Sequence, residues 1–316
     1  MLSYAALCRH PAAFPSLTGV TRPAFDALAD QFERAEQDRR DRSATTRRSH
    51  KPRHNAPGAG RPHDHGPRDR LLMALVWLRI YPTYEVLGFF FDLHKRNAQL
   101  NVLAVLDILD TLDDFPFDRP TRDRKKLRSA AEVMGAFPQV RVIIDGKEQR
   151  TNRPTGYEAQ KPYYSGKKKT HTLKNQVVVD PCGRIETVSA TVPGGANHDL
   201  TLLRGSGVLE RLAEGEGAMV DKGYVGVKKY YPNVPIVIPF KASRNHPLSA
   251  EQEASNREVA RHRIVVEHTM AQLNRFTVLR QVFRGQKRDR HSRVFQVVAK
   301  LVNRRLVVKP LKTYVA

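Results

Sequence analysis

Apolar residues recur at helical spacing near the start of the chain and then disappear. In residues 1–36, Phe25, Leu28 and Phe32 fall on one face of a predicted helix. Residues 37–67 are rich in Arg, His, Pro and Gly, and contain almost no apolar side chain larger than Ala. Such a segment has too little apolar surface to offset the entropy of ordering it. The pattern therefore predicts an N-terminal helical segment followed by a basic linker.

Three closely spaced apolar patterns follow in residues 68–130, and they predict helices over residues 71–80, 83–90 and 95–109. A short middle helix with tight connections is typical of a helix-turn-helix domain, although a helical packing or dimerisation module has the same hydrophobic pattern. In a helix-turn-helix the last helix lies in the major groove and presents its first residues to base edges. Arg, Asn and Gln side chains suit bidentate contacts with bases. The side chains at that place are Lys95, Arg96, Asn97 and Gln99.

Beyond residue 138 the pattern changes to short apolar strands. Residues 140–144 predict a strand that Asp145 closes, and Gly146 then lets the backbone turn away. Residues 172–179 and 184–192 predict a hairpin, because the four residues between them begin with Asp-Pro and end with Gly.

Strands and helices alternate after this hairpin. A helix through Leu202 to Leu212 is predicted, with Asn197-His198-Asp199 as its cap. The further predicted elements are strands over 218–220 and 235–239 and helices over 249–275 and 292–306. This order predicts an α/β domain over residues 138–310.

The composition adds a strong positive charge. The chain has 54 Lys and Arg against 32 Asp and Glu among 316 residues, a formal net charge of +22. A polyanionic partner is expected, because neutralising phosphates releases condensed counterions. No stretch reaches the roughly 18 apolar residues that span a membrane, and the first residues lack the features of a secretory signal. The two cysteines, Cys8 and Cys182, are too few for a disulfide framework or a cysteine zinc site. We expect an intracellular protein that binds nucleic acid.

Three acidic residues are candidates for a metal site. Asp145 and Asp221 each end a predicted strand, and Glu267 lies near the apolar face of a long predicted helix. Carboxylates so placed can hold the two divalent ions that phosphoryl transfer on DNA requires. Taken singly, an Asp before Gly also makes an ordinary turn. Arg263, one helical turn before Glu267, can form a helix salt bridge with it or hold the scissile phosphate.

Other charged residues near these positions have competing interpretations. Asp199 precedes a predicted helix, and we expect it to cap the helix rather than bind metal. The histidines within residues 50–65 lack a zinc-ligand spacing. A basic run next to a DNA-cutting site is expected to contact backbone phosphates, and it consists of Lys167, Lys168 and Lys169.

Several ordered motifs together resemble DDE-superfamily transposases, most closely the insertion sequence five family, to which Harbinger transposases are related. The resemblance spans residues 68–310. It is carried by Ile144-Asp145-Gly146, Tyr164-Ser165-Gly166-Lys167-Lys168-Lys169, His171-Thr172-Leu173-Lys174-Asn175-Gln176, Pro193-Gly194-Gly195-Ala196-Asn197-His198-Asp199, Asp221-Lys222-Gly223-Tyr224 and Arg263-Ile264-Val265-Val266-Glu267-His268.

The resemblance implies a ribonuclease-H-like mixed sheet flanked by helices, preceded by the all-α helix-turn-helix domain. It implies a catalytic triad of Asp145, Asp221 and Glu267, holding two Mg²⁺ ions for which Mn²⁺ can substitute, with Arg263 beside them. The sequence departs from the family at Asn274, where many relatives have Lys, and at Ala260, where a neighbouring group has Tyr. These two departures put in doubt how the protein would hold the DNA backbone near the cut.

These features predict a DNA transposase that binds terminal inverted repeats, cleaves DNA strands and joins them to target DNA. Its partners would be double-stranded DNA and further copies of itself, as a homodimer or larger assembly. It would work in the bacterial cytoplasm at the nucleoid, with no membrane partner. A catalytically silent regulator, a stand-alone nuclease and a basic structural protein bound to RNA are the alternatives. The predicted divisions are 1–36, 37–67, 68–130 and 138–310.

Overall fold

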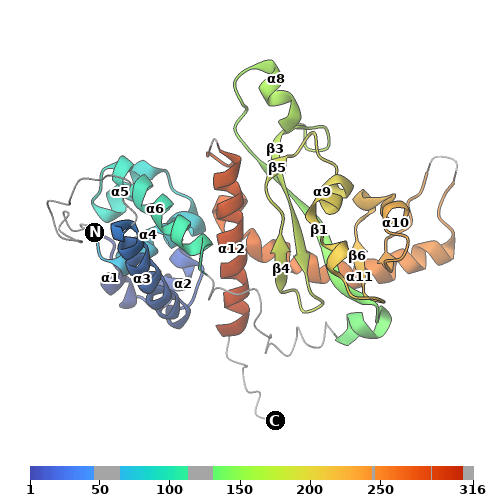
Figure 1. Ribbon diagram of the computed structural model, residues 1–316, viewed down its shortest axis with the longest axis horizontal. Helices are drawn as coiled ribbons and strands as arrows, with labels where there is room; N and C mark the ends of the chain where they lie inside the picture. The colour runs from blue at the N-terminus through green and yellow to red at the C-terminus, as the bar shows by residue number, and fades with distance from the viewer. Residues whose placement is uncertain (46–64, 113–130, 244–245, 286, 309–316) are drawn as a thin grey trace, which may run out of the picture. The chain divides into compact units, whose positions relative to one another are not determined.

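A computed structural model describes residues 1–45, 65–112, 131–243, 246–285 and 287–308. The chain forms two compact units (Figure 1). The N-terminal unit comprises Met1–Pro116 together with Phe276–Val278. The other, here called the sheet unit, comprises Phe117–Arg275 and Leu279–Ala316.

The described part of the N-terminal unit is helical. Its helices are α1 (Tyr4–Cys8), α2 (Ala13–Thr18), α3 (Arg22–Thr45), α4 (Pro67–Ile80), α5 (Tyr84–Phe91) and α6 (Lys95–Asp110). Helix α4 is the centre of this unit, since every side chain from Arg70 to Leu78 is buried and α2, α3 and α6 all pack against it. The hydroxyl of Thr83 caps α5 by accepting a hydrogen bond from the backbone N–H of Val86 at 3.3 Å. The three helices predicted from residues 71, 83 and 95 are confirmed.

The start of the chain differs from the prediction in two ways. Residues 1–36 contain three helices rather than one, and α3 continues to Thr45 through residues predicted to be linker. Periodicity cannot reveal what supports the longer α3: Arg40 pairs with Glu36 one helical turn before it, and Glu36 forms a buried ion pair with Arg70 on α4. A pair so placed holds the polar end of α3 against the core. The predicted linker beyond residue 45 lies mostly outside the described residues.

The sheet unit contains a mixed sheet. Strand β1 (Val140–Arg150) lies between β3 (Thr170–Val179), which is antiparallel to it, and β6 (Gly217–Val220), which is parallel. Strand β7 (Ile236–Val237) runs parallel to β6. The remaining strands pair with β3 in antiparallel fashion, and they are β2 (Tyr164–Ser165), β4 (Ile185–Val188) and β5 (Val192–Pro193).

Helices flank this sheet, so the predicted α/β class is confirmed. The longer ones are α9 (Asp199–Ser206), α11 (Ala250–Leu273) and α12 (Arg288–Val308). The short ones are α8 (Tyr157–Gln160), η1 (Lys161–Tyr163), η2 (Leu209–Arg211), η3 (Lys222–Tyr224) and α10 (Val227–Tyr230). Of the turn η4 (Thr277–Leu279), only Leu279 belongs to this unit. At the start of α11, Ser249 and Gln252 form a reciprocal capping box.

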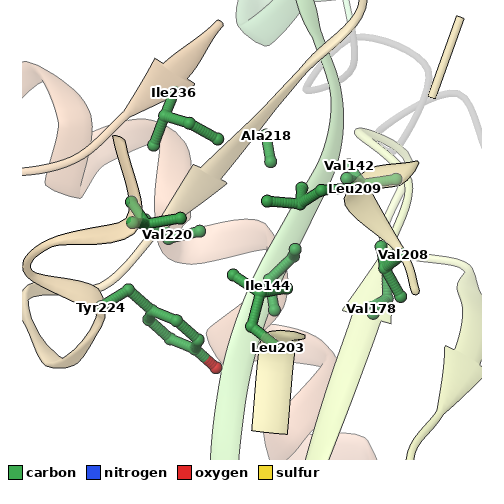
Figure 2. Packing of buried hydrophobic residues seen from close by; sticks show 11 residues of the cluster. Val142, Ile144, Val178, Leu203, Val208, Leu209, Ala218, Val220, Tyr224 and Ile236 are labelled. Atoms are coloured by element: carbon green, nitrogen blue, oxygen red, sulfur yellow. The ribbon is translucent and has the colours of Figure 1, made fainter. Parts of the chain in front are cut away.

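The two faces of β1 meet different helices, because successive side chains of a strand point to opposite faces. Ile144 belongs to an apolar cluster with Leu203 of α9 and Val220 of β6 (Figure 2). Asp145 and Gln149, at odd positions, contact side chains of α11 and α12. The α9 side of β1 therefore carries this apolar cluster, and from Asp145 onward the α11 side of β1 carries polar groups.

The strand predictions hold in type but not in length. Strand β1 does not end at Asp145 but continues to Arg150, because β3 pairs with it along this whole length. The predicted hairpin is confirmed, with Gly183 at φ 74° in its turn. Its second strand is interrupted, because the N–H of Gln176 donates to the Ser189 hydroxyl at 2.8 Å rather than to a backbone carbonyl.

The helix predicted to reach Leu212 also ends early. Gly207 adopts φ 61° after Ser206 and stops α9, because the left-handed conformation cannot continue a right-handed helix. Leu209–Arg211 then form the separate turn η2. The strand predicted over 235–239 is reduced to β7, since a proline at either end has no N–H to donate.

Candidate active site

Asp145 and Asp221 lie side by side where two parallel strands part. Ile144 of β1 pairs with Val220, the last residue of β6, and each aspartate directly follows one of these two residues along the chain. Neighbouring strands are about 4.8 Å apart, so this register brings the carboxylates to the same edge. Each carboxylate also accepts a hydrogen bond from the backbone N–H of the residue after it. The structure thus brings these two predicted site residues together.

Arg263 of α11 bridges the two aspartates. One of its terminal nitrogens is 3.7 Å from Asp145 Oδ2, and the other is 3.5 Å from Asp221 Oδ1. The side chain is only 12% exposed, and its Nε has no hydrogen-bond partner among the residues that the structure describes. The guanidinium therefore balances the two carboxylates rather than forming the alternative salt bridge with Glu267.

Asp199 is a third carboxylate at this edge, reaching it from α9. A Cβ built on Gly146 would lie 2.7 Å from Asp199 Oδ1, and one built on Gly223 would lie 2.7 Å from Oδ2. Glycines in these two turns thus leave the space that the carboxylate occupies. The prediction that Asp199 caps a helix is wrong, because His198 occupies the N-cap without a side-chain hydrogen bond.

A buried lysine holds Asp199 in place. Lys174 of β3 lies directly across from Glu148 of β1. Its Nζ is 3.2 Å from Glu148 Oε1 and 3.3 Å from Asp199 Oδ1, and it donates to the backbone carbonyl of Asn197 at 2.9 Å. One ammonium thus serves two carboxylates, which leaves negative charge in excess on this side of the edge.

The three aspartates influence one another electrostatically. Burial raises the pKa of Asp145, the positive charge of Arg263 lowers it, and the charges of Asp221 and Asp199 raise it again. The charges of the same three aspartates also act on Tyr224. Burial raises the pKa of its hydroxyl, and all three aspartates raise it further. A group of carboxylates that raise one another's pKa in this way favours a cation among them.

Glu267 lies one helical turn after Arg263 on α11, with its side chain exposed. Within the ranges that the structure describes, no group of three His, Cys, Asp or Glu side chains is close enough to hold a metal ion. Two of the three predicted ligands are thus brought together, and the place of Glu267 in a metal site stays a prediction.

Lys147 extends the polar face of β1 beyond Asp145. Its Nζ donates to the side-chain oxygen of Asn274, the C-cap residue of α11, at 2.5 Å. Burial, and then the nearby charge of Lys168, lower the pKa of this amine to about 8. Asn274 is one of the positions at which the sequence departs from the family it resembles.

The remaining predicted contact residues are placed as follows. Helix α6 begins with three exposed side chains, Lys95, Arg96 and Asn97, followed by the half-buried Gln99. The basic run lies in the turn between β2 and β3, where Lys167, Lys168 and Lys169 are exposed. The charge of Lys168 lowers the pKa of Lys147.

Sequence reasoning missed Lys147, Lys174 and Glu148 as parts of the site. A period-two pattern beyond Asp145 would have pointed to Lys147, but only if β1 had been predicted to continue past that residue. The Lys174–Glu148 pair depends on the register between two strands, which no local pattern specifies.

Comparison with known proteins agrees with this geometry. Residues 144–303 match the family model described as DDE superfamily endonuclease. The chain belongs to this superfamily. It is therefore an enzyme of the class that includes DDE endonucleases and transposases, which act on DNA and generally use divalent metal ions.

The chain is also similar to a transposase along nearly its full length. The chain is 28% identical over 300 residues to the probable transposase for insertion sequence element IS702 of Microchaete diplosiphon, covering 94% of this chain and 95% of that protein. No solved structure gives a significant match. None of the helices in the described ranges is long and apolar enough to cross a membrane.

Proposed function

We propose that this DDE-superfamily enzyme is a transposase that binds the terminal inverted repeats of its element, cuts DNA at the Asp145–Asp221 edge and joins the freed end to target DNA. The observation that carries the proposal is the strand register that sets the two aspartates side by side with Arg263 between them. The family match and the transposase relative point to the same chemistry.

The donor set fits hard divalent cations such as Mg²⁺ or Mn²⁺. Asp145, Asp221, Asp199 and Glu148 supply four carboxylates around this edge, and Arg263 and Lys174 supply two positive charges. The excess of two negative charges favours divalent cations, and carboxylate oxygens are the ligands that Mg²⁺ prefers. In this proposal Asp145, Asp221 and Glu267 hold two ions, which would activate the attacking oxygen and stabilise the leaving one.

The protein side chains would orient the DNA for that chemistry. Arg263 presents a planar fork of donors suited to the oxygens of a phosphate. The exposed run Lys167, Lys168 and Lys169 would hold neighbouring phosphates by charge. Water is kept from one side of the edge by the apolar cluster around Ile144 and Tyr224.

We further propose that α4, α5 and α6 form a helix-turn-helix domain, with α6 in the major groove. Connections of three residues join these helices. The exposed side chains Lys95, Arg96 and Asn97 stand at the start of α6, where base contacts are made in such domains. For the sheet unit we propose the ribonuclease-H-like fold, which the mixed strand order with β1 between β3 and β6 supports.

Bringing two element ends together requires more than one active site, so we propose a homodimer or larger assembly on DNA. The proposed substrate would place the activity in the bacterial cytoplasm, at the nucleoid.

The test uses duplexes that carry the inverted repeat found beside the gene, with Mg²⁺ in the buffer. Wild type should cut at the repeat end and join a pre-cut end to a target plasmid. Asp221→Asn should bind the repeat normally but cut more slowly by several orders of magnitude. The substitution replaces one carboxylate oxygen with an amide nitrogen and removes the negative charge that would bind the metal ion. Asp289→Asn, an exposed residue of α12, is the matched control and should cut normally. Cutting by Asp221→Asn at the wild-type rate would refute the site, whereas cutting without joining would favour a stand-alone nuclease.

A further inference from the structure

The ammonium of Lys147 stands on the polar face of β1 beside the aspartate edge. Lys147 is two residues after Asp145, so both side chains point toward α11. Asn274 at the end of α11 accepts a hydrogen bond from the Lys147 Nζ. The amine is thus fixed between a strand and a helix end.

This ammonium has no acidic partner within the described residues. Its hydrogen-bond acceptor is a neutral amide oxygen, and the carboxylate of Asp145 faces Arg263 instead. The other charge acting on it is that of Lys168, which repels it. A cation taken partly out of water without a counter-ion is unfavourable. An arrangement that keeps one there is suited to an anion arriving from outside.

We propose that Lys147 binds a phosphate of the DNA backbone next to the bond cut at Asp145 and Asp221, and that Asn274 positions its amine. This inference rests on the proposed function. The anion class follows from chemistry, because the same edge would receive the phosphodiester to be cut.

The two partners can be exchanged, which gives the proposal a direct test. In Lys147→Asn the amine is removed and an amide faces Asn274. In the double variant Lys147→Asn/Asn274→Lys, the ammonium returns to the same place from the helix side. A residue needed only for packing would not be rescued by moving its charge to another element.

The first measurement is equilibrium binding of the inverted-repeat duplex without divalent ions, at a series of salt concentrations. One phosphate contact contributes about 0.9 to the slope of log K against log salt. Lys147→Asn should lower that slope by about this amount, and the exchanged double variant should restore it. Lys228→Asn, which removes an exposed lysine of α10, is the matched control for removal of one positive charge.

The second measurement is single-turnover cutting with Mg²⁺. Lys147→Asn should cut on the order of tenfold to a hundredfold more slowly, the range expected for one charge-assisted hydrogen bond. The double variant should regain most of the rate, and Lys228→Asn should cut as wild type does. Thermal melting followed by circular dichroism establishes that each variant is folded.

Two results would overturn the inference. One is a Lys147→Asn variant that keeps the wild-type salt slope and rate. The other is a folded double variant that behaves like the single one, because the ammonium would then have no role at that place. If wild type itself fails to cut, the proposed function is refuted, and the salt slope still reports whether Lys147 contacts a phosphate.

Discussion

At the level of single residues, the absence of two side chains shapes the aspartate edge. Gly146 and Gly223 each follow closely on an aspartate, and a Cβ at either would lie 2.7 Å from a carboxylate oxygen of Asp199. Neither position has positive φ among the residues described, so the requirement for glycine comes from close approach and not from backbone conformation. The position of the Asp199 carboxylate therefore depends on glycines in two different segments of the chain.

Gly146→Ala tests this dependence. The added methyl group should push the Asp199 carboxylate away from Lys174, lowering the free energy of unfolding by about 1–3 kcal/mol and slowing Mg²⁺-dependent cutting. Urea unfolding and cutting assays measure the two effects. Gly205→Ala in α9, where no atom lies within 4 Å of the built Cβ, should be neutral or stabilising. Equal stability of Gly146→Ala and wild type would show that Asp199 moves without cost.

Between elements, the junction of β1 with α12 buries a neutral histidine. His291 is fully buried, with Nδ1 2.8 Å from the Thr191 hydroxyl and Nε2 2.9 Å from Gln149 Oε1. The second acceptor is an amide oxygen, so Nε2 donates the proton and Nδ1 accepts one from Thr191. Burial, and then the charge of Lys147, lower the pKa of His291 to about 3.

The sign of the pH dependence follows from this lowered pKa. Below about pH 6.5 the unfolded chain protonates this histidine while the folded chain does not, so acid favours the unfolded state. The free energy of unfolding should fall by up to about 1.4 kcal/mol per pH unit from pH 6 toward pH 4. His291→Asn should flatten that slope, as measured by urea unfolding at several pH values. The exposed His268→Asn is the control, and an unchanged slope in His291→Asn would contradict the assignment.

At the scale of the whole molecule, the helical N-terminal unit and the sheet unit divide the proposed work between recognition and chemistry. The net charge of +22 serves both, because any DNA-contacting surface gains from phosphate neutralisation. Sequence specificity, in contrast, needs base contacts, and the exposed start of α6 carries side chains suited to them.

Replacing Arg96 and Asn97 with Ala should separate sequence-specific binding from binding to the phosphate backbone. Affinity for the inverted repeat should fall by about 1–3 kcal/mol for each side chain that reads a base, while affinity for random duplex changes little. Fluorescence anisotropy with both duplexes measures this, with the exposed Arg34→Ala of α3 as control. An equal fall in affinity for both duplexes would mean that these residues contact only the backbone.

Local patterns in the sequence were sufficient for much of this protein. The helices α4 to α6, the β3–β4 hairpin and the two aspartates after Ile144 and Val220 follow from periodicity, turn chemistry and caps, which depend on near neighbours in the chain. The ordered motifs also led to the right superfamily, because they combine residue type with order along the chain.

Only the tertiary structure decided how far β1 runs, what holds Asp199 and where the Lys147 amine lies. Each of these depends on a partner distant in sequence: the pairing of β1 with β3, the Lys174–Glu148 register and the end of α11 at Asn274. Strand register and helix docking are set by packing over the whole core, so no window of sequence contains the information.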